Sequence, residues 1–243
     1  MISERQLAEL FDSFWQQQFP LLNASFIRRF NAEHEERVTT PEGAAVLPVP
    51  MGEGIKRFDL VAELAFEMAM DEPTTGGRAT SDYVAATERA LRRIAVLRRE
   101  PSIPPPDGLE LTEAKRLLNV YRSFLAQFST ADIQLKPRIR GTGILDAMEA
   151  DFCSPEILFE VKTVHRNLQS SDLRQVVCYL IAGLGSRQFA WIEYCIFNPR
   201  LAVFYHGRVD ELLAYMSGRT PHECINSFQD ALMDREQPIE SRF

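Results

Sequence analysis

Hydrophobic side chains recur at helical spacing through much of the first hundred residues. Ser3, a residue type that favours the start of a helix, precedes an amphipathic run formed by Leu7, Leu10, Phe11, Phe14 and Trp15. Residues 55–70 and 81–99 show the same pattern, whereas residues 31–54 have no regular period. We therefore expect a mainly helical N-terminal region, with Trp15 in a core or at a dimer contact.

Three consecutive prolines at positions 104–106 interrupt this pattern. A triple proline cannot continue a helix and favours an extended connector. The sequence therefore predicts a boundary here, between a mainly helical region over residues 1–107 and a second domain over residues 108–243.

The pattern changes after this boundary. A helix is predicted over residues 111–128, with Thr112 as a possible cap, followed by strand-like runs at 132–140, 143–153 and 156–164. The remaining predicted elements are a helix at 171–184, strands at 188–197 and 201–206, and helices at 209–216 and 221–233. This order predicts an α/β (α+β) fold, with a mixed sheet flanked by helices.

The run ILFEVK, residues 157–162, carries the first candidate chemistry. Glu160 and Lys162 lie two positions apart, so they share one face of a strand. Charged groups within an apolar strand are costly unless they are paired or bound to a metal. Taken alone, these two residues are more typical of a simple surface pair on a half-exposed strand.

The residues before this strand predict a hairpin. Residues 154–157, Ser-Pro-Glu-Ile, suit a four-residue turn with proline in its second position. The turn predicts three facing pairs, Asp151 with Glu160, Phe152 with Phe159, and Glu149 with Lys162. Alternation then predicts one apolar face that carries Met148, Ala150 and Phe152.

This hairpin would bring oxygen ligands and an ammonium group together. The carboxylates of Asp151 and Glu160 and the carbonyl of Val161 are hard donors that suit Mg²⁺ or Mn²⁺. The Lys162 ammonium beside them can orient a water molecule and offset charge that builds on a phosphate.

A further pair of residues follows on the next predicted helix. Gln175 and Tyr179 lie one turn apart, so both can point to the same side. The ordered set of an acid, E-x-K and Q-x-x-x-Y resembles the RecB-like branch of the PD-(D/E)XK nuclease superfamily. The resemblance covers roughly residues 111–206 and implies a restriction-endonuclease-like core with the order α-β-β-β-α-β.

The resemblance also implies a reaction, the metal-assisted hydrolysis of a phosphodiester. Asp151, Glu160 and the Val161 carbonyl would hold one or two divalent ions. Lys162 would position or help deprotonate the water, and Gln175 and Tyr179 would brace the lysine or contact the nucleic-acid backbone.

Two other acids compete for places in this site. Asp146 fits the G-x-x-D text of RecB-like enzymes, although in a regular strand it has the opposite parity to Asp151, and a β-bulge would be needed to restore it. We favour Asp151, because turn chemistry and alternation agree on it. Glu113 is the acid in position on the preceding helix.

Charge and composition do not identify the reaction, so the prediction of function rests on these motifs. The chain has 243 residues, of which 45% are hydrophobic, and a net charge of −7, which argues against coating nucleic acid by bulk electrostatics. Its four cysteines form no CxxC pair and are expected to be reduced thiols of a cytoplasmic protein. Basic side chains at Lys136, Arg138 and Arg140 would either follow a phosphate backbone or form a solvated edge, and Arg200 is a minor phosphate candidate.

Together these features predict a Mg²⁺- or Mn²⁺-dependent deoxyribonuclease, with RNA not excluded as substrate. Small nucleases of this resemblance act in prokaryotic defence against phage, restriction or repair. A homo-oligomer, a partner protein or the N-terminal region would deliver the substrate. The alternative is a catalytically inactive module of this fold that binds nucleic acid or acts as a scaffold in a larger complex.

Overall fold

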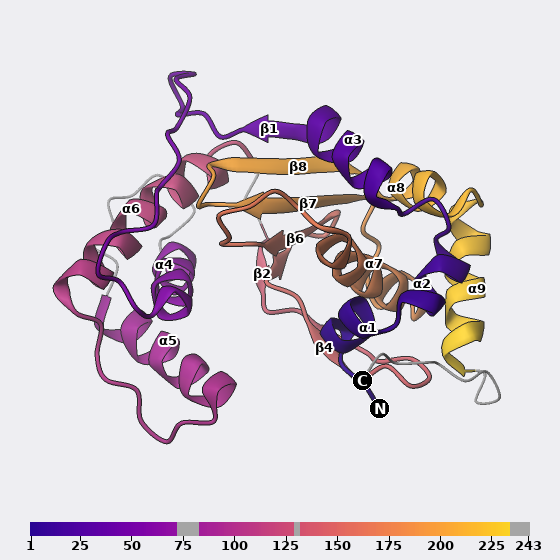
Figure 1. Cartoon of the computed structure of the whole chain (residues 1–243), viewed down its shortest axis with the longest axis horizontal. Coiled ribbons are helices and arrows are strands. Elements are labelled where there is room, and N and C mark those ends of the chain that lie inside the picture. The colour runs from indigo at the N-terminus through magenta and orange to yellow at the C-terminus, as the bar shows by residue number, and fades with distance from the viewer. Residues whose placement is uncertain (72–82, 129–131, 234–243) are drawn as a thin grey trace.

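The chain folds around a six-stranded mixed sheet with the strand order β1-β8-β7-β6-β5-β2 (Figure 1). In this computed structural model, residues 1–71, 83–128 and 132–233 are described. The strands of the sheet are β1 (Glu35–Arg37), β2 (Gln134–Leu135), β5 (Phe152–Cys153), β6 (Ile157–Val161), β7 (Glu193–Asn198) and β8 (Val203–Arg208). Strands β6 and β7 pair in parallel, and every other neighbouring pair is antiparallel.

Helices cover both faces of this sheet. Those before the prolines are α1 (Glu4–Leu10), α2 (Asp12–Gln18), α3 (Ala24–His34), α4 (Phe58–Asp71) and α5 (Tyr83–Arg98). Those after them are α6 (Gly108–Leu125), α7 (Ser170–Gly185), α8 (Val209–Ser217) and α9 (Pro221–Met233). The predicted α+β class, with a mixed sheet flanked by helices, is confirmed. Helix α7 supplies the crossover that a parallel strand pair requires.

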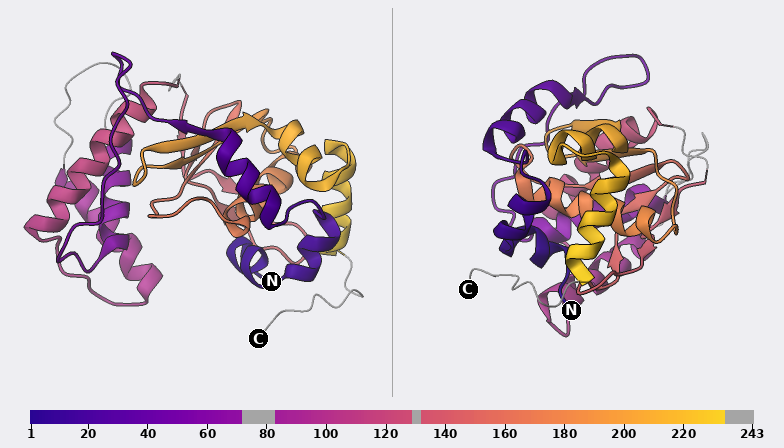
Figure 2. Two further views of the ribbon diagram at one scale, coloured as in Figure 1. Left: turned by 45° about the horizontal axis from the view of Figure 1, so that its top comes forward. Right: turned by 90° about the vertical axis from the view of Figure 1, so that its right-hand side faces the viewer.

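Two hydrophobic clusters correspond to the two faces of the sheet. Leu158 and Ile196 pack with α7, α1, α2 and α9 on one face. Phe159 and Phe197 pack with α4, α5 and α6 on the other, where the Phe197 ring stacks on Phe124 of α6 at 3.9 Å between centroids. Figures 1 and 2 show α4, α5 and α6 gathered at one end of the molecule. The helices from before and after the prolines therefore share both cores with the sheet.

The first two predicted strand-like runs appear as short, broken strands, whereas the third forms the continuous strand β6. Strand β2 continues towards β3 (Arg138–Ile139), and β4 (Met148–Glu149) leads into β5. The break falls at Lys136, whose φ of 48° lies in the left-handed region. Its amide still donates to the Asp151 carbonyl at 2.9 Å, so the two halves keep one register across the kink.

This kink makes one prediction wrong. Met148 and Ala150 are buried in the cluster that contains Leu158, whereas Phe152 is buried with Phe159 in the other cluster. The three side chains therefore do not share one apolar face. The chain changes face between Ala150 and Phe152, where a bend at Asp151 separates β4 from β5.

Several local predictions can be compared directly with the structure. Ser3 caps α1 through the Gln6 amide, and Trp15 is buried. The proposed cap of the long helix is wrong, because Asp107 accepts hydrogen bonds from Leu109 and Glu110 while the Thr112 hydroxyl donates to the Gly108 carbonyl. All four cysteines are free and buried. Across the described ranges, no helix combines the length and the apolar character needed to cross a membrane.

Candidate active site

The predicted hairpin is present between β5 and β6. The Ser154 amide donates to the Ile157 carbonyl at 2.9 Å, and the Ile157 amide donates back to Ser154 Oγ at 3.0 Å. Phe152 pairs with Phe159, which confirms the predicted register. Backbone pairing ends at Phe152, and Asp151 contacts β6 through its side chain. The predicted pair of Glu149 with Lys162 is wrong, because Glu149 pairs with Arg138 and its carboxylate lies 3.1 Å from Arg93.

Asp151 lies where the two strands of the hairpin diverge. Its Oδ2 accepts a hydrogen bond from the Val161 amide at 2.6 Å, while the neighbouring Ala150 amide donates away from β6, to the Pro137 carbonyl. The Asp151 carboxylate therefore accepts the hydrogen bond that the Val161 amide would otherwise donate to a backbone carbonyl of the neighbouring strand. Because the N–H and C=O of one strand residue point the same way, the Val161 carbonyl also faces this gap.

Glu160 and Lys162 share the α7 face of β6, as their spacing predicts. Glu160 is 4% exposed, and its Oε1 lies 2.9 Å from Lys162 Nζ. Burial tends to lower the pKa of Lys162, but the carboxylates of Glu160, Asp172 and Asp151 outweigh it and leave that pKa raised. Lys162 is therefore held as a cation.

Helix α7 completes the network from the other side. Lys162 Nζ donates to Gln175 Oε1, and Gln175 Nε2 donates to the Tyr179 hydroxyl at 2.7 Å. The one-turn spacing of Gln175 and Tyr179 makes this relay possible. Burial, with Glu160 and Asp151 nearby, raises the pKa of Tyr179, so its phenol stays protonated.

The two acids create an electrostatic need for a cation. Burial and the charge of Glu160 raise the pKa of Asp151 well above its usual range, and the Val161 amide and Lys162 offset this only in part. Two carboxylates and a carbonyl form a hard-oxygen set that suits Mg²⁺. No group of three or more His, Cys, Asp or Glu side chains arranged to hold a metal occurs among the described residues. The acids that fit Mg²⁺ are therefore a pair.

The other proposed acids lie elsewhere. The Asp146 amide donates to the Ile2 carbonyl, and Asp146 is not among the charges that act on Asp151. Glu113 is not a site residue, because its carboxylate bonds to Arg200 and accepts from the Gly52 amide at 2.8 Å. Arg200 is correspondingly buried, so the prediction that it contacts phosphate is wrong.

One acid near the site, Glu63, belongs to none of the sequence motifs. Glu63 of α4 is partly buried, and its charge acts on Asp151. Its Oε1 accepts no hydrogen bond but lies 3.5 Å from Lys136 Nζ. Glu63 and Glu67 lie four apart in the otherwise apolar run VAELAFEMAM, and this spacing was the available signal.

Lys136 joins α4 to the strand that leads into the site. Its ammonium bonds to Glu67, which also pairs with Arg89 of α5. Lys136 therefore fits neither predicted role, a phosphate contact or a solvated edge, because its ammonium forms ion pairs with Glu63 and Glu67. Arg138 and Arg140 are exposed.

The network around Lys162 opens into a pocket of about 380 Å³. Lys162 and Gln175 form its inner wall, and Arg5 of α1 and Arg166 line it as well. Arg166 pairs with Asp172, whose carboxylate also accepts from the Gln169 amide at the start of α7. Lys162 is therefore accessible from this pocket.

No family model matches the chain, and no curated protein matches it.

The ion-pair cluster around Glu67 predicts a pH dependence of stability. Burial alone raises the pKa of Glu67, but hydrogen bonds from Lys136 and Arg89 outweigh it and lower that pKa. A lowered native pKa means that the unfolded state binds more protons, so Glu67 stabilises the fold above about pH 4.3 and loses this effect as the pH falls through its native pKa. We expect the free energy of unfolding of Glu67→Gln, measured in urea, to change less between pH 6 and pH 4 than that of the wild type.

Glu63→Gln is the matched control with the opposite sign. Burial raises the pKa of Glu63, so its native form holds a proton to higher pH and its contribution weakens as the pH rises. Removing Glu63 should therefore steepen the acid loss of stability that removing Glu67 flattens. Equal slopes in both variants would contradict these assignments.

Proposed function

We propose that the protein is a divalent-metal-dependent nuclease that hydrolyses phosphodiester bonds in DNA. One observation carries the proposal, the convergence on one gap in the sheet of Asp151, Glu160, Lys162, Gln175 and Tyr179. The resemblance to PD-(D/E)XK nucleases rests on these same residues, and their contacts support it.

Asp151, Glu160 and the Val161 carbonyl are the groups that would hold Mg²⁺ or Mn²⁺. Mg²⁺ keeps several waters and is often bound by only one or two protein carboxylates, so the acid pair suits it. When bound, such an ion polarises a phosphate and lowers the pKa of a coordinated water.

Lys162 has a narrower role here than the resemblance allows. Because its pKa is raised, it serves as a cationic donor that orients water and offsets phosphate charge, and it does not remove the proton. Gln175 fixes the ammonium by accepting from it, and Tyr179 fixes the Gln175 amide. Arg5 and Arg166 also line the pocket and would contact a bound phosphate.

The direct test is incubation of the full chain with plasmid and linear duplex DNA in Mg²⁺ or Mn²⁺, with EDTA as the control. We expect cleavage that EDTA abolishes. RNA of matched sequence is the parallel substrate, and cleavage of RNA alone would overturn the choice of DNA while leaving the site in place.

Metal binding should also be visible without catalysis. A ligand that binds only the native state stabilises it by about 2.7 kcal/mol at a concentration of 100 Kd. We expect Mg²⁺ to raise the melting temperature of the wild type and of Glu156→Gln, an exposed change on the same hairpin. Asp151→Asn should lose this increase. An equal Mg²⁺ effect in all three proteins would place the metal elsewhere.

One observation favours the alternative of an inactive module. Lys162 is already neutralised by Glu160 and held by Gln175, so the polar network is largely satisfied without an ion. Such a protein would shift DNA in a gel and cut none of it with either metal.

A further inference from the structure

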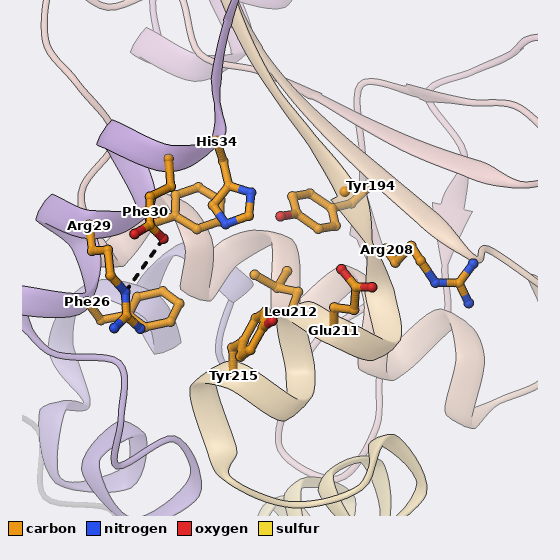
Figure 3. Close-up of a pocket in the computed structure, with 11 residues that line it drawn as sticks. Phe26, Arg29, Phe30, His34, Tyr194, Arg208, Glu211, Leu212 and Tyr215 are labelled. Carbon is orange, nitrogen blue, oxygen red and sulfur yellow. Dashed lines mark ion pairs between the residues drawn. The ribbon is translucent and has the colours of Figure 1, made fainter.

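A second pocket, of about 380 Å³, lies between α3, the β7–β8 pair and α8 (Figure 3). It shares no lining residue with the candidate active site or with the pocket beside Lys162. Its size is within the range of small-molecule sites. Whatever this pocket binds is therefore additional to the proposed nuclease chemistry.

Aromatic rings form much of its wall. Phe26 and Phe30 of α3 stack at 6.0 Å between centroids, and Phe30 stacks on His34 at 4.8 Å. Figure 3 shows Tyr194 and Tyr215 across the space from these α3 side chains. Facing aromatic surfaces favour a flat ligand that can stack.

The Tyr194 hydroxyl is the main polar group aimed into this space. Tyr194 is 2% exposed, and its hydroxyl makes no hydrogen bond with any described residue. Although the Tyr194 side chain is largely buried, its hydroxyl oxygen opens onto the pocket, where a ligand can accept from it. Gly207 keeps the space in front of it open, because a Cβ there would lie 3.0 Å from the Tyr194 oxygen.

The charges around the pocket leave one carboxylate without an ion-pair partner. Arg29 pairs with Glu33 at 3.7 Å, and Arg208 pairs with Asp210 at 3.0 Å. The Glu211 carboxylate has no such partner among the described residues, and in Figure 3 it points up beside the Tyr194 ring. The Glu211 carboxylate is exposed to solvent and is therefore free to accept N–H donors from a ligand.

We propose that this pocket binds a guanine base. Guanine is flat, and its N1–H and N2–H₂ groups form two adjacent donors that match one carboxylate, here Glu211. The Tyr194 hydroxyl then donates to an acceptor on the same ring. A simple cation could pair with Glu211 but would give the proton of the Tyr194 hydroxyl no acceptor. Adenine and cytosine each offer a single amino group, so they should bind more weakly.

Titration calorimetry with GMP, AMP, CMP and UMP tests this assignment on the full chain. The buffer contains EDTA, so the result is independent of metal-dependent cleavage. We expect saturable GMP binding with a Kd below about 1 mM, and binding of the other nucleotides at least ~10-fold weaker. No saturation with GMP, or equal binding of all four nucleotides, would overturn the proposal.

Substitutions locate the binding. Glu211→Gln should weaken GMP binding at least ~10-fold and remove the preference over AMP, because an amide cannot accept from both donors. Tyr194→Phe keeps the ring and should weaken binding by less. Glu88→Gln, an exposed change on α5, should leave binding unchanged. Melting temperatures check that each variant is folded, and wild-type affinity in a folded Glu211→Gln protein would contradict the site.

The base could come from a free nucleotide or from an unpaired position in a strand. Fluorescence anisotropy with a labelled thymine oligonucleotide that carries one guanine separates these sources. Binding that GMP competes away identifies a strand ligand, and GMP binding without oligonucleotide binding identifies a free nucleotide. Oligonucleotide binding that GMP does not displace would count against the pocket.

Discussion

Asp151→Asn is expected to reduce DNA cleavage by at least ~10²-fold, the usual cost of losing one strong electrostatic contact at a reacting centre. Asparagine keeps the shape of the side chain and an oxygen that can accept from the Val161 amide, so the gap between β5 and β6 should persist. What is lost is the negative charge that, with Glu160, makes this gap suitable for a divalent ion. The measurement is the initial rate of plasmid cleavage in Mg²⁺.

Asp146→Asn is the matched control, because it makes the same change five residues earlier on the chain. Its amide donates to the Ile2 carbonyl, and the charges that act most on Asp151 are those of Glu160, Lys162 and Glu63. We expect nearly full activity. The reverse result, an inactive Asp146→Asn beside an active Asp151→Asn, would show that the G-x-x-D text and not the hairpin identifies the first acid. Full activity in both variants would remove this site from the reaction.

The hairpin could be predicted because its determinants are local. A proline in the second position of a four-residue turn fixes the connection, and alternation then fixes which residues face each other. The contact between Gln175 and Tyr179 could be predicted for the same reason, since one helical turn sets its geometry. In this hairpin turn and along this turn of α7, sequence and structure agree.

The missed features depend on contacts between distant segments. Glu63 lies near Asp151 only because α4 packs on the sheet. The ion pair of Glu63 with Lys136 likewise joins two segments that are far apart in the sequence. Strand β1 was missed because Glu35, Glu36 and Arg37 are all exposed, so this edge strand carries no hydrophobic alternation. The change of face before Phe152 follows from the kink at Lys136. Its positive φ could not be predicted, because lysine rarely adopts the left-handed region.

The second large expected effect concerns stability at the pair formed by Glu113 and Arg200. Their side chains are 2% and 3% exposed, respectively. Breaking a buried ion pair by removing one partner typically costs about 3–5 kcal/mol, because the remaining charge stays buried without compensation. We expect Arg200→Met to lower the free energy of unfolding by this amount in urea denaturation. Arg208→Met, which removes the exposed pair with Asp210, should cost less than about 1 kcal/mol.

The double variant Glu113→Leu with Arg200→Met separates the charge from the packing. If the cost of the single change is the uncompensated Glu113 carboxylate, removing that carboxylate should recover much of the lost stability. Recovery should be incomplete, because the Gly52 amide also donates to Glu113, and Arg200 donates to the Pro50 carbonyl at 3.3 Å. The pair thus connects the segment before α4 to α6 and to the β7–β8 turn. Equal losses of unfolding free energy for Arg200→Met and Arg208→Met would show that this connection does not stabilise the fold.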